Sequence, residues 1–173
     1  MPLLNLEEAA KRFPNASFTT AVGNPALRAK LTEKAKQFGL VEHSLIHPTV
    51  IRSRHVRFGA GVVVCAGSTL TTDIEVGKGV QININCSVSH DCVLGDYATL
   101  APGVHLCGNV HVGRGAYIGA GVVVKNGTPD RPLVIGPGTV VGAGACVTKS
   151  WEAGLTVVGV PAAILRQRSC NAT

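Results

Sequence analysis

A repeat of six residues runs through the middle of the chain without a slip. From Val56 to Gly127 the sequence divides into the twelve hexads VRFGAG, VVVCAG, STLTTD, IEVGKG, VQININ, CSVSHD, CVLGDY, ATLAPG, VHLCGN, VHVGRG, AYIGAG and VVVKNG. Every third position is apolar, and every first position is aliphatic or small. Two inward positions separated by one residue have the period of a β-strand. The repeat therefore predicts short strands joined by corners, with the coils stacked around one apolar column.

A second period fixes the number of strands in each coil. Gly59, Gly77, Gly95 and Gly113 all hold the fourth position of a hexad, and they recur every 18 residues. Three hexads per coil make a triangular prism, in which residues i and i+18 lie above one another about 4.8 Å apart. We therefore predict a mainly β fold, a parallel β-solenoid.

The hexads are interrupted once and are flanked by different segments. TPDRP, at residues 128–132, carries two prolines and no apolar ladder residue, so we expect a loop expelled from the prism over 126–132. This loop is either idle or covers a binding groove. We predict three parts of the chain: a truncated α/β fragment over 1–42, the β-helix over 43–160, and a C-terminal helix and tail over 161–173. The segment AAILRQR is expected to form the short helix that caps the solenoid.

The first part has its own secondary-structure signals. Leu27, Leu31, Ala35 and Phe38 have helical spacing, and Gly39 follows as a stop signal. Residues 17–23 and 40–47 are expected to form strands on either side of this helix, and residues 6–13 suit a further short helix. This fragment is too short for a complete α/β domain.

Composition narrows the class of protein. The net charge is +6, but the basic residues are scattered singly with few aromatics among them, so a small polyanionic ligand fits at least as well as nucleic acid. No run of about 18 apolar residues is present, so we expect no membrane-spanning helix. The N-terminus carries acids where a secretory signal would carry bases. The six cysteines form no C-x-x-C pair and indicate reduced thiols in a cytoplasmic protein.

Residues 84–124, INCSVSHDCVLGDYATLAPGVHLCGNVHVGRGAYIGAGVVV, carry a family resemblance. With Asn83 just before it, this stretch resembles the hexapeptide-repeat acyltransferases, and most closely the bacterial sialic acid and nucleotide-sugar acetyltransferases. The likeness covers about residues 17–165 and is most specific over 80–150. It implies a left-handed parallel β-helix, a homotrimer with sites between subunits, acetyl-CoA as acyl donor, and a sugar or sugar-like acceptor with an amino or hydroxyl group.

The resemblance implies that His90 is the general base and that Asp91 supports its basicity. The residues agree with these roles. His90 holds the fifth position of CSVSHD, a corner, so its ring should project outward, and the residue one coil above is Gly108. Histidine titrates near neutral pH, and a carboxylate partner favours its charged form while it removes a proton from the acceptor. A glycine above the base leaves a gap beside backbone N–H groups that suits a thioester carbonyl.

The resemblance also implies binding residues. It assigns the backbones of Gly108, Ala120 and Ala143, along the same groove as His90, to the pantetheine arm of the donor. It makes Lys149 and Arg166 candidates for the CoA phosphates, although each serves equally well as a solubilising charge. It places Asn83 near the acceptor. No metal ligands are implied.

The sequence departs from the family pattern at two points, and it leaves two alternative functions open. Thr99 stands where the family often has a second histidine, and the N-terminal part lacks the family's glycine-rich nucleotide-binding turn. The second departure favours an alternative function, a non-catalytic solenoid scaffold that lost its acceptor-binding half. A zinc hydratase on the same prism is the other rival, but His105 and His111 hold second positions whereas His90 holds a fifth.

Overall fold

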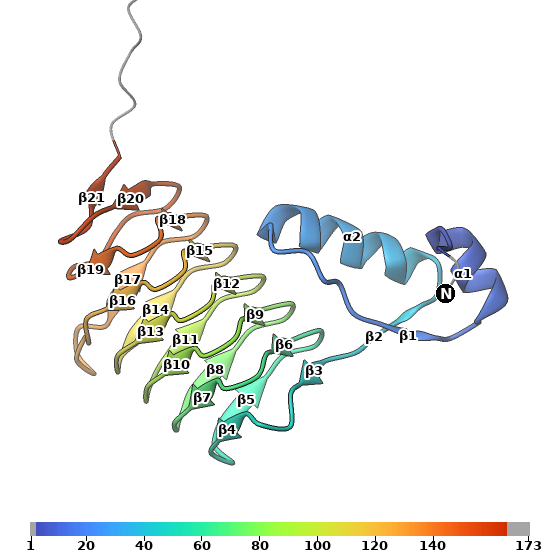
Figure 1. The fold of residues 1–173 in the computed structure, drawn as a ribbon, viewed down its shortest axis with the longest axis horizontal. Helices are drawn as coiled ribbons and strands as arrows, with labels where there is room; N and C mark the ends of the chain where they lie inside the picture. The colour runs from blue at the N-terminus through green and yellow to red at the C-terminus, as the bar shows by residue number, and fades with distance from the viewer. Residues whose placement is uncertain (1–2, 166–173) are drawn as a thin grey trace, which may run out of the picture.

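The chain forms a three-faced parallel β-helix preceded by two short helices (Figure 1). The computed structural model describes residues 3–165. Face 1 has eight strands: β3 (Leu45–Ile46), β6 (Val63–Val64), β9 (Gln81–Ile82), β12 (Thr99–Leu100), β15 (Tyr117–Ile118), β18 (Val140–Val141), β20 (Thr156–Val158) and β21 (Ala163–Ile164). Face 2 has six: β4 (Ile51–Arg52), β7 (Thr69–Leu70), β10 (Ser87–Val88), β13 (His105–Leu106), β16 (Val123–Val124) and β19 (Cys146–Val147). Face 3 has five: β5 (Val56–Phe58), β8 (Ile74–Val76), β11 (Val93–Leu94), β14 (Val110–Val112) and β17 (Leu133–Ile135).

The strand register confirms the coil length that the glycine spacing predicted. On face 2, Ser87 pairs with Thr69 below it and with His105 above it, so each coil takes 18 residues. On face 3, His111 pairs with Val134, a longer step that accommodates the five extra residues of the insertion. The insertion therefore lies outside the ladders, and the prism continues above it without a change of register.

The core is the column of first and third hexad positions. From Val62 to Val124 all of these side chains are buried. Cys86 and Cys92 belong to this column, and their thiols donate to the carbonyl oxygens of Ala101 and Cys107, each at 3.2 Å. Burial raises the pKa of the Cys92 thiol to about 11, which leaves it protonated and unreactive at neutral pH. Both cysteines are packing residues.

Adjacent residues of β16 provide a test of this inward and outward alternation. Val124 is fully buried, whereas Val123 beside it is 42% exposed. We expect Val124→Ala to lower the free energy of unfolding by about 2–3 kcal/mol, because it removes two methyl groups and leaves a cavity. Val123→Ala should change it by no more than about 0.5 kcal/mol. Denaturant unfolding of the two variants measures this difference, and equal losses would contradict the assigned register.

The corners explain which residues hold the sixth position. That position takes a left-handed backbone, with a φ of 56° at Asn85, 57° at Asp91 and 57° at Asn109. Glycine fills it in most of the other hexads. Asparagine, aspartate and glycine are the residues that tolerate this conformation best. The left-handed backbone of this corner therefore favours an aspartate at position 91 independently of any catalytic role.

The N-terminal helices form where the sequence predicts them. Helix α1 (Leu6–Arg12) begins with a capping box between Asn5 and Glu8, and α2 (Pro25–Gln37) begins at the N-cap Asn24. The predicted strand over 17–23 is shorter than expected, because only β1 (Ser17–Phe18) pairs, with β2 (Val41–Glu42). Residues 19–23 instead run extended across face 1 towards α2. None of the helices within residues 3–165 is long and apolar enough to cross a membrane.

The prediction of a C-terminal helix beginning at residue 161 is wrong for the residues described. Strand β21 turns back and pairs antiparallel with β20, and the Leu165 N–H donates to the Thr156 carbonyl at 2.8 Å. The physical reason is that β20 would otherwise end face 1 with unpaired backbone groups, which a returning strand satisfies. The remainder of the predicted helix, residues 166–173, lies outside the described part of the chain.

Candidate active site

His90 and Asp91 form an exposed pair at the edge between faces 2 and 3. They follow β10 in the corner that leads into β11. The His90 Nδ1 lies 2.7 Å from the Asp91 Oδ2, and the two side chains are 56% and 53% exposed. This bond fixes the ring so that Nε2 is the nitrogen left for another partner. The outward projection predicted from the hexad register is confirmed.

Gly108 covers the His90 ring from the coil above. The Asn109 N–H donates to the His90 carbonyl at 3.0 Å, which stacks the two corners. A Cβ added to Gly108 would lie 2.5 Å from the His90 Cε1 and 2.6 Å from Nε2, both far inside van der Waals contact. Only a residue without a side chain leaves room for the ring in this position. The corner is therefore shaped around His90.

The insertion and Lys149 lie along the same edge as His90. The Gly127 N–H donates to the Gly108 carbonyl at 3.0 Å, so the insertion rises from the coil directly above Gly108. Its tip is a tight turn in which Thr128 and Arg131 bond through their backbones. Lys149 follows β19 on this edge, with its Nζ 4.7 Å from the centre of the Trp151 ring. Arg166, the other predicted phosphate contact, lies outside the described residues.

Ala120 and Ala143 lie on a different edge, between faces 1 and 2. They stack on one another, because the Gly144 N–H donates to the Ala120 carbonyl at 2.8 Å. The structure therefore brings together His90, Asp91 and Gly108 on one edge, and Ala120 and Ala143 on another. The prediction that these backbones run along one groove with His90 is therefore wrong within a single chain, because they lie on two different edges of the prism.

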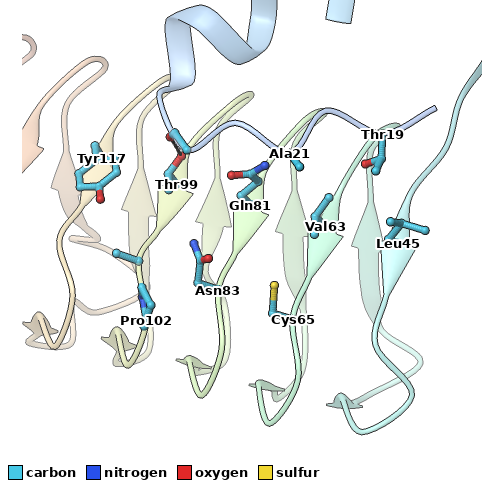
Figure 2. A pocket seen from close by; sticks show the side chains of 12 residues that line it. Thr19, Ala21, Leu45, Val63, Cys65, Gln81, Asn83, Thr99, Pro102 and Tyr117 are labelled. Atoms are coloured by element: carbon cyan, nitrogen blue, oxygen red, sulfur yellow. Dashed lines mark hydrogen bonds between the residues drawn. The ribbon is translucent and has the colours of Figure 1, made fainter. Parts of the chain in front are cut away.

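Asn83 lies beside a cavity on face 1 (Figure 2). It follows β9 at the edge between faces 1 and 2, whereas His90 of the same chain follows β10 at the edge between faces 2 and 3. The cavity has a volume of about 390 Å³ and lies between face 1 and the extended residues 19–23. The Asn83 Nδ2 donates to the Leu100 carbonyl at 2.8 Å, which orients the amide. Figure 2 shows Asn83 and Cys65 along one side of the cavity and Thr19, Ala21 and Thr99 along the other.

Arg28 of α2 holds residues 19–23 over face 1, and sequence reasoning missed it. The predicted helix is present, but its buried residues are Arg28, Thr32 and Ala35, whereas Leu27 and Phe38 are exposed. The Arg28 guanidinium donates to Gly79 O (2.8 Å), Val22 O (2.8 Å), Gly23 O (3.1 Å), Gln81 Oε1 (3.3 Å), Tyr97 O (2.6 Å), Ala98 O (3.2 Å) and Thr99 Oγ1 (2.9 Å). Burial lowers its pKa to about 10, so it stays protonated at neutral pH.

Thr99, which stands in place of the family's second histidine, has a structural role here. Its side chain is buried, and its hydroxyl donates to the Gly23 carbonyl at 3.1 Å while it accepts from Arg28. Both hydrogen-bonding functions of the hydroxyl are therefore used to hold the segment 19–23. A contact assigned to that histidine in the family has no counterpart in this chain.

The histidines that a zinc hydratase would need lie apart in this chain. His105 is on face 2, where its Nδ1 lies 2.7 Å from the Ser87 Oγ, and His111 is on face 3. Among residues 3–165, no three histidine, cysteine, aspartate or glutamate side chains are grouped so that they could hold a metal ion. Within one chain, these two histidines therefore do not share a site.

Comparison with known proteins gives consistent matches. Residues 73–106 match the family described as bacterial transferase hexapeptide (six repeats). The chain is 39% identical over 145 residues to the GDP-perosamine N-acetyltransferase of Escherichia coli O157:H7, a match that covers 84% of this chain and 66% of the relative. The chain therefore spans about two thirds of the length of that curated relative.

Two solved structures resemble the fold closely. WeeI from Acinetobacter baumannii AYE is 44% identical with a TM-score of 0.86, and the match covers 88% of this chain and 72% of WeeI. PerB from Caulobacter crescentus, solved in complex with CoA and GDP-perosamine, is 35% identical with a TM-score of 0.86, and the match covers 93% of this chain and 75% of PerB. The Caulobacter protein has also been solved with one histidine replaced by asparagine or by alanine.

Proposed function

Because the chain belongs to the hexapeptide-repeat acetyltransferases, we propose that it transfers the acetyl group of acetyl-CoA to the amino group of a nucleotide-linked sugar. The observation that carries this proposal is the His90–Asp91 pair beneath Gly108. The sequence left amino and hydroxyl acceptors open. The name of the Escherichia coli relative and the GDP-perosamine bound by the Caulobacter protein favour the amino group.

The proposed mechanism is direct attack with His90 as the general base. The acceptor amine forms a bond to the acetyl carbon while His90 Nε2 takes its proton, and Asp91 stabilises the resulting imidazolium. The C–S bond of the thioester then breaks, and the proton leaves with the CoA sulfur. The Gly108 N–H has no acceptor within the described residues, and in this proposal it donates to the negative charge that develops on the acetyl oxygen.

The donor groove of this proposal runs between two copies of the chain. Gly108 lies on one edge and Ala120 and Ala143 lie on another, so a pantetheine arm that contacts all three needs edges from two subunits. Leu45 and Ile84, in the first coils of the prism, are each 48% exposed, which supports a surface covered by another copy at that end of the solenoid. We therefore retain the homotrimer with sites between subunits. Lys149 and Arg166 are the proposed contacts for the CoA phosphates.

Asn83 is the proposed contact for the acceptor. Its Nδ2 is already bonded to Leu100, so its Oδ1 is the free group, and an amide oxygen accepts hydrogen bonds from an amine or a hydroxyl. Asn83 and His90 of one chain lie on different edges of the prism. The proposal therefore pairs Asn83 of one subunit with the base of another.

A cytoplasmic location is part of the proposal. The five cysteines within the described residues are free thiols, and Cys86 and Cys92 are needed as thiols in the core. Structural thiols of this kind suit a reducing compartment.

Consumption of acetyl-CoA with a panel of acceptors tests the function. We expect native protein to acetylate nucleotide-linked amino sugars such as GDP-perosamine and to leave the corresponding hydroxyl sugars largely unchanged. Equal use of amino and hydroxyl sugars would contradict the assignment of N-acetylation. If acetyl-CoA neither binds nor is consumed with any acceptor, the alternative of a non-catalytic solenoid scaffold replaces the proposal.

Asp91→Asn tests the role of the carboxylate. Asparagine tolerates the left-handed corner, so the backbone should be unchanged while the charge is lost. We expect kcat to fall about ten- to hundredfold, because a hydrogen bond to a charged group contributes about 1.5–3 kcal/mol. Asp73, with a φ of 52° one coil below on the same edge, provides the matched control, and Asp73→Asn should keep native turnover. Equal kcat values for native protein and Asp91→Asn would remove Asp91 from the mechanism.

A further inference from the structure

We infer that Arg54 binds the diphosphate of a nucleotide-linked acceptor, two coils below His90 on the same edge of the prism. This inference rests on the proposed function and adds a group by which the acceptor is held. Arg54 follows β4 in the corner between faces 2 and 3, as His90 follows β10. Strands β4, β7 and β10 are stacked in that order, and each pairs with the next (Figure 1). Because stacked strands are about 4.8 Å apart, the two corners are separated by about 10 Å.

The first coil carries a concentration of basic side chains. Residues 43–57 contain three arginines and three histidines and no acidic residue, which makes this end of the prism attractive to an anion. Two of the arginines are already engaged. The Arg52 guanidinium lies 5.4 Å from the centre of the Phe58 ring, and Arg57 is ion-paired with Glu75 at 2.6 Å on face 3. The third arginine of the coil remains for a ligand.

That third arginine, Arg54, is exposed and has no carboxylate partner. Among residues 3–165 its guanidinium forms no ion pair, and only its Nε is bonded, to the His55 Nε2 at 3.3 Å. The N–H groups of the two terminal nitrogens therefore have no partner within those residues. They form a planar fork that matches two oxygen atoms of a phosphate group. Arg54 is thus equipped for bidentate recognition of a phosphate.

The charges along this edge allow phosphates to approach His90 from two opposite ends. The carboxylates of Asp73 and Asp91 occupy the middle of the edge and make it unfavourable for an anion. Cationic side chains lie beyond them, with Arg54 below and Lys149 above. The donor and the acceptor of the proposed reaction each carry phosphate groups, and each must present its reacting atom at His90. Two cationic ends with one base between them fit such a pair of substrates.

The separation between Arg54 and His90 suits the acceptor. In a nucleotide-linked amino sugar, one sugar ring and one bridging oxygen separate the amine from the diphosphate, a path of about six bonds of about 1.5 Å each. This path, together with an arginine side chain, spans two coils. The pantetheine arm of CoA is much longer and suits the corner at Lys149, which lies three coils above His90, about 14 Å away.

Steady-state kinetics of Arg54→Ala test the assignment. We expect KM for GDP-perosamine to rise at least about tenfold, while kcat and KM for acetyl-CoA stay within about twofold of native values, because the lost contact binds the acceptor alone. Arg57→Ala is the matched control, since it removes an exposed arginine of the same coil that already has a carboxylate partner. It should leave all three constants near their native values. A rise in KM for acetyl-CoA alone would assign Arg54 to the CoA diphosphate and overturn the inference.

Calorimetric titration of the full chain with GDP and with GMP, without acetyl-CoA, isolates the phosphate contact. We expect native protein to bind GDP about tenfold more tightly than GMP, because Arg54 contacts the phosphate that carries the sugar in the acceptor. Arg54→Ala should reduce the affinity for GDP to that for GMP and leave the affinity for GMP unchanged. Equal weakening of GDP binding in Arg57→Ala would show a general effect of positive charge and would overturn the inference.

The outcomes separate this inference from the proposed function. A native KM for GDP-perosamine in Arg54→Ala would overturn the inference, while consumption of acetyl-CoA by native protein still supported an acetyltransferase. If native protein consumed no acetyl-CoA with any nucleotide-linked amino sugar but bound GDP in a manner that depends on Arg54, the function would be overturned and the diphosphate site supported.

Discussion

His90→Ala is expected to lower kcat by about 10²–10⁴-fold, the usual contribution of a positioned acid–base group. The side chain is 56% exposed and, within residues 3–165, bonds only to Asp91, so its loss removes little packing. The thermal unfolding temperature should therefore stay close to that of the native protein. The effect is measured as the steady-state rate of acetylation of an amino sugar, detected through the CoA thiol that the reaction releases.

His105 provides a control for the loss of an exposed imidazole. It lies on face 2 in the coil above and bonds to Ser87 rather than to a carboxylate. His105→Ala should keep turnover within about twofold of the native value, as expected for a surface substitution. A His90→Ala protein that folds and retains native turnover would eliminate the general-base mechanism.

Gly108→Ala is the second large effect that we expect, a loss of at least about tenfold in kcat. The new Cβ would lie 2.5 Å from the His90 Cε1 and 3.1 Å from Nδ1, so the ring must move away from its present position. Misplacement of a reacting group by about 1 Å has cost about a hundredfold in other enzymes. Gly108 does not have a left-handed φ, so alanine adds no backbone strain and the fold should be retained.

A double-mutant cycle separates this clash from other causes. In the His90→Ala background the ring is absent, so Gly108→Ala should lower the residual rate by less than about twofold. The measurement is the residual acetylation rate of the single and double variants. A full, independent loss in that background would show that Gly108 acts other than by making room for His90.

The repeat was the most predictable part of the fold. Positions such as Val64, Leu100 and Ile118 are buried because a strand alternates its side chains, and the glycine spacing gave the coil length that the pairing of Ser87 with His105 confirms. The exposure of His90 and the position of Gly108 above it follow from the same register. Local periodicity was sufficient because each coil contacts only its neighbours.

The features that sequence reasoning missed depend on contacts distant in sequence. A buried arginine is rare, and the acceptors that make Arg28 stable come from residues about 50–70 positions away. The apolar spacing of α2 predicted the helix but not the face that it buries. The segment after Pro161 looked helical by composition, whereas the open end of face 1 determined its conformation. The role of Thr99 likewise became clear only once Gly23 lay beside it.

The anchoring of Arg28 has a consequence for how acceptor preference can change. Five of its seven hydrogen bonds go to main-chain carbonyls, which every amino acid supplies. The wall of the cavity is thus fastened mainly to the backbone, and residues such as Val63 and Tyr117 are not needed to hold it. Under the proposal that Asn83 contacts the acceptor, substitutions at these positions are expected to change which sugar is accepted while the wall stays attached, because the groups that would contact the sugar are not those that hold the wall.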